Sequence, residues 1–323
     1  MLALVLLAGA GAAAPNPPTT SLFAAADPTH TQIAPGVSMP FVNDGIVLDT
    51  RGNGTRPNET ASLELFFSLG GRGADTAWSY HDQPAVGRAI RGAPLPRSEL
   101  FVTTKIECMG SAEGAYLAIE RDLLQLGLPQ TDLVLIHSPF KGGFGEPPVG
   151  NCSEGPAGAA ARQATWQGME RALKSGLTRA IGLSNFDVAY MNDILQGATV
   201  TPAVNQCCLS VGQQARRQDE ITFAKAHGIT YQAYSPLGGA DIGGTSVLSL
   251  PQLKQIAAKH GKSTAQIALK WLVQHGHPFA TATGRAEYMK EDLSLFDFEL
   301  TEAEMATLDA VDVPLPKDCK PHW

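Results

Sequence analysis

Short apolar runs alternate with segments of helical spacing along most of the chain. Apolar residues that recur three and four positions apart predict helices over Ala112–Leu126, Gln163–Lys174, Val188–Leu195, Arg216–His227, Leu253–His260 and Thr264–His275. The runs between them predict buried strands at Gly45–Leu48, Phe101–Lys105, Leu133–His137, Ala180–Leu183, Ala203–Asn205 and Thr230–Ala233. Strands that alternate with helices in this way form βαβ units and a parallel sheet.

About eight such units fit a closed (β/α)8 barrel, or TIM barrel, better than a doubly wound sheet. No break in composition marks a second domain, so we expect a single-domain α/β protein whose barrel spans residues 30–323. Ser263 is a candidate N-cap. Residues 19–35 are typical of a polar connection, and 141–161, rich in Gly, Pro and Ala, predict a long loop after a strand.

The amino terminus carries an apolar segment at residues 2–14 that prolines interrupt. It is shorter than the roughly 20 residues of a membrane span, so we expect no stable span. Residues 1–18 are instead typical of a signal peptide. Asn-x-Ser/Thr sequons at Asn53, Asn58 and Asn151 are N-glycosylation acceptors, which favours a secreted or ER-lumenal glycoprotein. The alternative is a cytoplasmic enzyme with an irrelevant apolar start.

Composition narrows the class of protein. The chain has 323 residues, 44% hydrophobic and 17% charged, with a net charge of −7 and no basic cluster, so nucleic acid is an unexpected partner. Its five cysteines show no Cys-x-x-Cys or Cys/His spacing, so no metal site is expected. These exclusions leave a small-molecule enzyme, which we expect to be a monomer.

Polar residues stand at or just after many predicted strand ends, where packing alone would favour apolar side chains. In a parallel barrel these positions meet at the carboxyl-terminal rim, where barrel enzymes keep their active sites. The residues are Asp75, Lys105, His137, Ser184, Asn185, Asn205, Gln206, Tyr234 and Ser235.

Four side chains could together protonate a carbonyl oxygen. A Tyr with its usual pKa near 10 is a poor acid at neutral pH, and a nearby Lys lowers that pKa. A carboxylate keeps the Lys charged, and a neutral His can donate a hydrogen bond to the substrate oxygen. Tyr80, Lys105, Asp75 and His137 supply these groups, although each alone could serve packing or capping. The electrons would have to come from a nicotinamide cofactor.

Ordered motifs of the chain resemble the aldo-keto reductase family. They are Asp75-Thr76-Ala77 with Tyr80 and Gln83-x-x-Val86-Gly87, TTK at 103–105, IHSP at 136–139, GLSNF at 182–186, PAVNQ at 202–206, AYSPLG at 233–238 and KEDLSLFDFELTEAEM at 290–305. The similarity covers about residues 30–313 in family order. It implies a (β/α)8 barrel that reduces aldehydes or ketones with NAD(P)H.

The resemblance also implies residue roles. Tyr80 would be the proton donor, tuned by Lys105 and Asp75, and His137 would orient the carbonyl. Substrate would meet His137, Trp78 and Phe140, although core packing explains the last two equally well. The nicotinamide would be held by Ser184, Asn185, Gln206 and Tyr234, the pyrophosphate and ribose by Ser235 and Leu237, and the adenosine end by Thr283, Arg285, Glu291 and Asp292.

The adenosine end departs from the family pattern. The family has Lys-Ser and then an Arg five residues beyond that Ser to grip the 2′-phosphate, whereas this chain has Ala282-Thr283 and Tyr288. Arg285 lies nearby and could substitute. Because a phosphate dianion is normally bound by Arg or Lys, we expect NADP(H) or NAD(H) with the preference open.

Two further alternatives concern function and cysteine pairing. The chain could be a cofactor-binding regulatory barrel that senses redox state with little or no turnover. Cys152, in the long loop, and Cys319, near the carboxyl terminus, are expected near one rim, where a disulfide between them would close the pocket in an oxidising compartment. Cys207 and Cys208 are interpreted as small buried residues rather than a redox pair.

Overall fold

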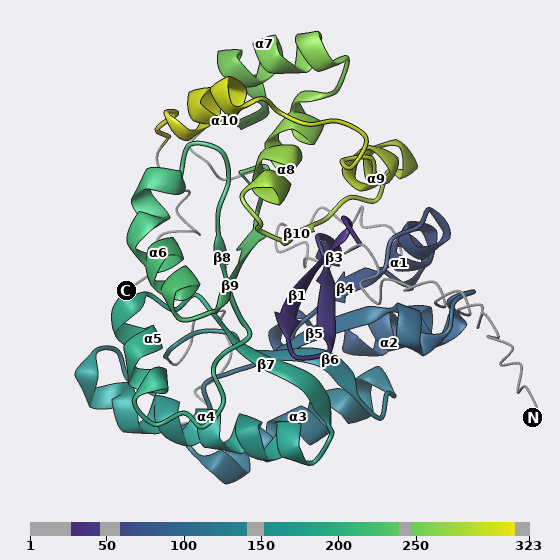
Figure 1. The fold of residues 1–323 in the computed structure, drawn as a ribbon. Helices are drawn as coiled ribbons and strands as arrows, with labels where there is room; N and C mark the ends of the chain where they lie inside the picture. Colours follow the sequence, from purple (N-terminus) through teal and green to yellow (C-terminus); the bar gives the residue numbers. More distant parts are fainter. Residues whose placement is uncertain (1–26, 46–58, 141–151, 239–246, 314–323) are drawn as a thin grey trace, which may run out of the picture.

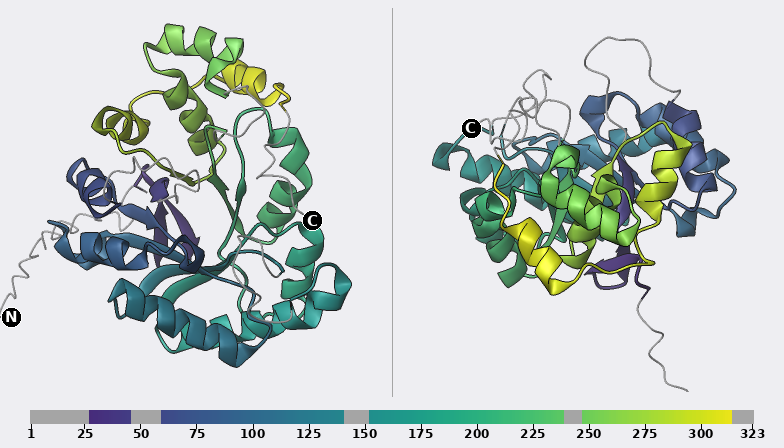
Figure 2. Two further views of the ribbon diagram at one scale, coloured as in Figure 1. Left: turned by 180° about the vertical axis from the view of Figure 1, so that it is seen from behind. Right: turned by 90° about the horizontal axis from the view of Figure 1, so that it is seen from above.

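A closed barrel of eight parallel strands forms the centre of the protein, and helices surround it (Figure 1). The computed structural model describes residues 27–45, 59–140, 152–238 and 247–313. The strands follow one another around the barrel in the order β10-β3-β4-β5-β6-β7-β8-β9. Figure 2 shows the same outer ring of helices from two further sides. The predicted (β/α)8 barrel is confirmed.

The barrel strands are short and mostly buried on both faces. β5 and β6 are buried at every position, as expected for strands covered by helices outside and by side chains inside. The barrel strands are β3 (Val42–Gly45), β4 (Gly73–Asp75), β5 (Phe101–Ile106), β6 (Thr131–Ile136), β7 (Thr178–Ser184), β8 (Val204–Cys208), β9 (Thr230–Tyr234) and β10 (Phe279–Thr281).

The helices pack their apolar faces on the outside of the barrel. They are α1 (Glu59–Ser68), α2 (Gln83–Gly92), α3 (Ala112–Leu126), α4 (Ala159–Lys174), α5 (Val188–Leu195), α6 (Gln218–Ala226), α7 (Pro251–His260), α8 (Thr264–Gln274), α9 (Ala286–Leu293) and α10 (Glu302–Asp309). In the described ranges, none is long and apolar enough to cross a membrane.

Local capping explains where several helices begin and end. The Ser111 hydroxyl accepts a hydrogen bond from the backbone N–H of Gly114 and so begins α3, and Gly127 ends that helix with a left-handed φ of 62°. Ser263 and Gln266 form a reciprocal capping box at the start of α8. The predicted N-cap at Ser263 is confirmed.

A hairpin covers the amino-terminal end of the barrel. β1 (His30–Ala34) pairs antiparallel with β2 (Val37–Pro40). Ile33 and Met39 of the hairpin pack in one apolar cluster with Phe101, Leu133, Leu135, Ala180, Ala203 and Val204, of which three stand at or before the starts of barrel strands. The expected connection over 19–35 is therefore wrong for residues 30–34, and residues 19–26 lie outside the described ranges.

The first barrel strand also lies earlier than predicted. β3 ends at Gly45, where the sequence pattern placed the start of a strand at 45–48, and residues 46–48 lie outside the described ranges. The sequence pattern does not indicate this strand, because Asn43 and Asp44 are polar residues in buried positions. β4 and β10, at three residues each, are too short to leave a period in the sequence.

Helix boundaries shift by a few residues. α4 begins at Ala159, so part of the expected loop 141–161 is helical, while 141–151 lies outside the described ranges. The segment predicted as a helix over Arg216–His227 is a 3₁₀ turn (Gln214–Arg217) followed by α6.

A disulfide joins the loop after β5 to the segment before α4. Cys108 and Cys152 are bonded, with their Cα atoms 6.0 Å apart. The predicted Cys152–Cys319 pair is therefore wrong, because Cys152 already has a partner from a neighbouring rim segment. Cys319 lies outside the described ranges. Cys208 is also disulfide-bonded, and Cys207 is free and buried.

Candidate active site

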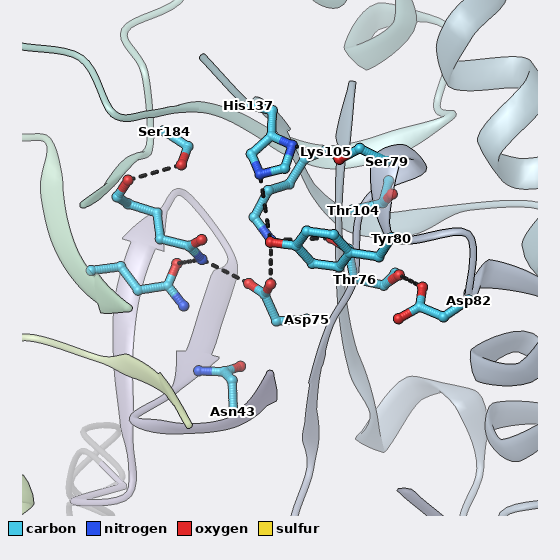
Figure 3. A network of polar contacts seen from close by, with 12 residues as sticks. Asn43, Asp75, Thr76, Ser79, Tyr80, Asp82, Thr104, Lys105, His137 and Ser184 are labelled. Atoms are coloured by element: carbon cyan, nitrogen blue, oxygen red, sulfur yellow. Dashed lines mark hydrogen bonds and ion pairs between the residues drawn. The ribbon is translucent and has the colours of Figure 1, made fainter. Parts of the chain in front are cut away.

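Three neighbouring strands deliver the predicted catalytic residues to the same rim. Asp75 is the last residue of β4, Lys105 lies in β5, and His137 directly follows β6. Tyr80 comes from a 3₁₀ turn (Trp78–Tyr80) just beyond β4. Figure 3 shows the four side chains pointing toward one another. The structure thus brings together all four residues that the sequence singled out for chemistry.

The Tyr80 hydroxyl lies between an ammonium and an imidazole. The Lys105 ammonium donates to Tyr80 Oη at 3.4 Å and to the Thr76 carbonyl at 3.1 Å, and it is ion-paired with the Asp75 carboxylate. His137 Nε2 lies 3.5 Å from the same Tyr80 oxygen. The Lys105 and Asp75 side chains are only 1% and 3% exposed, so solvent screens this pair little.

Burial and the Lys105 charge have opposite effects on the pKa of the Tyr80 phenol. Burial raises the pKa of Tyr80 above its usual value, although Lys105 alone would lower it. The expected acidification is thus present as a contribution but is outweighed in this structure. Burial alone would lower the pKa of Lys105, but Asp75 and Tyr80 outweigh burial and raise that pKa. At neutral pH the site therefore holds a protonated phenol beside a charged ammonium.

His137 contacts two groups through its other ring nitrogen. Ser79 Oγ lies 3.1 Å and Glu107 Oε1 lies 3.5 Å from His137 Nδ1. Burial lowers the pKa of His137, and Glu107 acts against this shift. Sequence reasoning missed Glu107, although a carboxylate two residues beyond Lys105 at a buried strand end was a visible signal.

Amide and hydroxyl groups gather at the ends of β7, β8 and β9. Asn185 donates to the His137 carbonyl at 3.0 Å and to Ser184 Oγ at 3.1 Å, and it accepts from the Tyr234 hydroxyl at 2.9 Å. Its φ of 63° is left-handed, a conformation that Asn tolerates better than most residues. Ser184 Oγ donates to the Gln206 carbonyl at 2.9 Å.

Gln206 connects this group to the Asp75 carboxylate. Its Nε2 donates to Asp75 Oδ2 at 2.7 Å and to Gln232 Oε1 at 3.0 Å. Gln232 Nε2 is buried and makes no hydrogen bond within the described residues. Hydroxyl and amide groups that both donate and accept match the chemistry of a nicotinamide carboxamide, so the residues here fit the implied cofactor.

The residues predicted for the pyrophosphate and ribose follow β9. Ser235 and Leu237 are both partly buried, and Ser235 has a left-handed φ of 50°. A non-glycine residue in this region costs energy and persists only where its surroundings hold it. This strain at the rim is consistent with a functional segment.

The predicted adenosine residues lie after β10 and on α9. Thr283 Oγ1 accepts from the backbone N–H of Arg285, and the Arg285 guanidinium lies 4.5 Å from the ring centroid of Tyr288. Arg285, Tyr288 and Ala282 are exposed. Glu291 accepts from the Ser263 hydroxyl at 2.7 Å.

Acidic residues approach each other on the inner side of this end. Burial, reinforced by Asp292 and Asp75, raises the pKa of Asp44 to about 7. Burial and then Glu291 raise the pKa of Asp292 to about 7. Asp44 is a second residue that sequence reasoning did not single out, because it lies in the strand whose position was misjudged.

The two aromatic residues predicted at the substrate mouth have different surroundings. Trp78 is partly exposed, and the Arg121 guanidinium lies 3.3 Å from its ring centroid. Phe140 is 8% exposed and belongs to the apolar core, and its ring centroid lies 5.8 Å from that of Tyr190. Core packing thus accounts for Phe140, and the substrate role of both residues stays a prediction. Within the described residues, no cluster of His, Cys, Asp or Glu could hold a metal ion.

Comparisons with known proteins show the family to which the chain belongs. The model of the Aldo/keto reductase family matches residues 50–313. An aldo-keto reductase of Mycolicibacterium vanbaalenii is 38% identical over 78% of this chain and 81% of its own length. The glyoxal reductase of Bacillus subtilis is 32% identical over 86% of this chain and 90% of its own length. The crystal structure of an aldo-keto reductase of the silkworm Bombyx mori is 29% identical, with a TM-score of 0.78 over 88% of this chain and 87% of that one. A crystal structure titled as the NADPH complex of the same enzyme has a TM-score of 0.77, with 28% identity over 88% of both chains.

Proposed function

Since the chain belongs to the aldo/keto reductase family, we propose that it reduces an aldehyde or ketone with NAD(P)H and that Tyr80 is its proton donor. The observation that carries the assignment is the position of the Tyr80 hydroxyl, 3.4 Å from Lys105 Nζ and 3.5 Å from His137 Nε2. A phenol held between a buried cation and an imidazole suits proton transfer to a developing alkoxide.

Each side chain has a separate task in this reaction. A bound nicotinamide would supply the hydride that the carbonyl carbon accepts. Tyr80 gives its proton to the carbonyl oxygen, and Lys105 stabilises the phenolate that remains. Asp75 holds the ammonium charged and aimed at the phenol, while His137 fixes the direction of the carbonyl oxygen. Solvent then restores the proton of Tyr80.

Ser184, Asn185 and Gln206 would hold the nicotinamide carboxamide, with Tyr234 against its ring. The Tyr234 hydroxyl is already bonded to Asn185, so the ring and the amide group form one preassembled unit. Preassembly favours tight binding because little side-chain entropy remains to be lost.

At the adenosine end we expect NADH to be accepted as well as NADPH. Ala282 and Tyr288 carry no charge, and Arg285 is the nearby cation that could meet a 2′-phosphate. The guanidinium is exposed and lies against the Tyr288 ring, which weakens its competition for a phosphate.

We also propose passage through the secretory pathway. The apolar leader and the sequons favour it, and the disulfide-bonded residues Cys108, Cys152 and Cys208 are typical of an oxidising compartment. Expression in a secreting eukaryotic cell, followed by glycosidase treatment and mass measurement, tests this: an unglycosylated chain retained in the cytosol would contradict it.

The functional assay follows NADPH and NADH oxidation with a panel of aldehydes and ketones that includes glyoxal. We expect turnover by the wild-type chain, whereas Tyr80→Phe should lose turnover and keep cofactor binding, measured by protein fluorescence. Binding without any turnover in the wild type would support the regulatory alternative. Full activity of Tyr80→Phe would refute the assigned acid.

A further inference from the structure

A buried carboxylate faces the side of His137 that is turned away from Tyr80. Glu107 stands just beyond β5 and is 8% exposed. Its Oε1 lies 3.5 Å from His137 Nδ1, within ion-pair distance, and makes no hydrogen bond within the described residues. The reaction proposed above assigns this carboxylate no task.

The loop that carries Glu107 is held in place. Its neighbour Cys108 is disulfide-bonded to Cys152, and the backbone N–H of Gly110 donates to Thr165 Oγ1 at 2.9 Å. Since a disulfide and a hydrogen bond to α4 follow Glu107 within three residues, the carboxylate cannot move far from the imidazole. Its contact with His137 is therefore a built feature of the site.

A carboxylate at this distance selects one form of the ring. Ionised Glu accepts hydrogen bonds but cannot donate, so it favours a proton on His137 Nδ1. Ser79 Oγ, 3.1 Å from the same nitrogen, can accept from that N–H as well. In the neutral ring Nε2 then carries a lone pair, and this lone pair faces the Tyr80 hydroxyl.

We propose that Glu107 is a positioning residue that holds His137 in the Nδ1–H form, so that Nε2 donates a hydrogen bond to the substrate oxygen only when the ring is protonated. This inference rests on the proposed carbonyl reduction. Tyr80 still transfers the proton that ends on the product oxygen. The imidazolium adds a charged donor to that oxygen, and the Glu107 carboxylate balances the charge.

The groups around the ring compete in their effect on its protonation. Burial and Lys105 disfavour the imidazolium, while Glu107 and Asp75 favour it. Burial prevails, so the pKa of His137 already lies below its usual value. Glu107 is the charged group beside Nδ1, so its removal should lower that pKa further. Carbonyl reduction by the wild type should therefore decline as the pH rises through the pKa of His137, which burial holds below its usual value.

The test substitutes Glu107→Gln, which keeps the size of the side chain and removes its charge. Nitrogen-15 NMR of histidine-labelled protein, with His137→Asn to assign the signal, reports the tautomer and the titration of His137 without cofactor. We expect an Nδ1–H ring in the neutral wild type, and in Glu107→Gln a titration midpoint lower by about one pH unit or more. The alkaline limb of kcat/KM should move by the same amount. Glu113→Gln, on the exposed start of α3, is the matched control and should change neither.

The two proposals fail in distinguishable ways. If Glu107→Gln leaves both the His137 titration and the alkaline limb at the wild-type pH while turnover continues, the inference about Glu107 is overturned and carbonyl reduction stands. If wild-type His137 is an Nε2–H ring at neutral pH, the inference is equally overturned. If the NMR result is as expected but no carbonyl compound is reduced, the proposed function fails instead.

Discussion

Removal of the Cys108–Cys152 disulfide should lower the free energy of unfolding of the protein. The two residues are 44 positions apart in sequence, and the segment between them contains α3 and β6. A cross-link over this length removes about 13 cal/mol/K of entropy from the unfolded chain, which corresponds to about 4 kcal/mol of stability at 25 °C.

The variant to compare is Cys108→Ala/Cys152→Ala. Alanine avoids burying two new polar groups at positions that are 1% and 0% exposed. With an unfolding entropy of about 2.1 cal/mol/K per residue, the loss of about 4 kcal/mol corresponds to a melting temperature lower by about 6 °C. Denaturant unfolding and calorimetry measure the two quantities.

Cys207→Ala is the matched control, because Cys207 is a buried cysteine without a disulfide. It should lose no more than the packing of one sulfur atom, about 1 kcal/mol. Peptide mapping of the wild type without reduction should recover the Cys108–Cys152 cross-linked peptide. Equal stability of the double variant and this control, with no cross-linked peptide, would refute the reasoning.

Three other variants test the electrostatics of the site. Lys105→Met should lower kcat by about 100-fold or more, since the phenolate loses its stabilising cation, and stopped-flow single turnovers should locate the loss in the chemical step. Asp44→Asn should raise the melting temperature more at pH 8 than at pH 5. The pKa of the wild-type carboxyl rises from 3.8 to about 7 on folding, so the folded protein holds a proton that the unfolded chain releases, and wild-type stability falls from pH 5 to pH 8. An equal effect at both pH values would contradict this. Ala282→Lys with Tyr288→Arg should tighten NADPH relative to NADH by about tenfold or more in fluorescence titrations, and an unchanged ratio would show that neither position meets the 2′-phosphate.

The structure brings together the four residues predicted for catalysis, and two of them could be located because polar side chains at strand ends stand out from the apolar runs. Lys105 and His137 stand where apolar runs stop, and a parallel barrel must bring such positions to one rim. Asp75 ends a three-residue strand that leaves no pattern of its own, and the family resemblance added roles for Asp75 and Tyr80 to the chemistry that their residue types indicated. All four then meet within hydrogen-bonding reach.

The features that sequence reasoning missed depend on contacts between distant segments. Nothing in the spacing of the cysteines indicates that Cys152 reaches Cys108 rather than Cys319, because that choice depends on how two rim segments fold over α4. Glu107 reads as an ordinary strand-end carboxylate until β6 places His137 beside it. Asp44 is polar in a buried strand, which is the opposite of what the binary pattern expects.

The central claim is that hydride reaches a carbonyl carbon while Tyr80 protonates the oxygen, and deuterium transfer measures it most directly. Cofactor deuterated at C4 of the reduced nicotinamide is incubated with the wild-type protein and an aldehyde, and the alcohol is analysed by mass spectrometry. We expect one deuterium on the carbinol carbon with the wild type and almost no alcohol with Tyr80→Phe. Alcohol without deuterium, or equal product from both proteins, would contradict it.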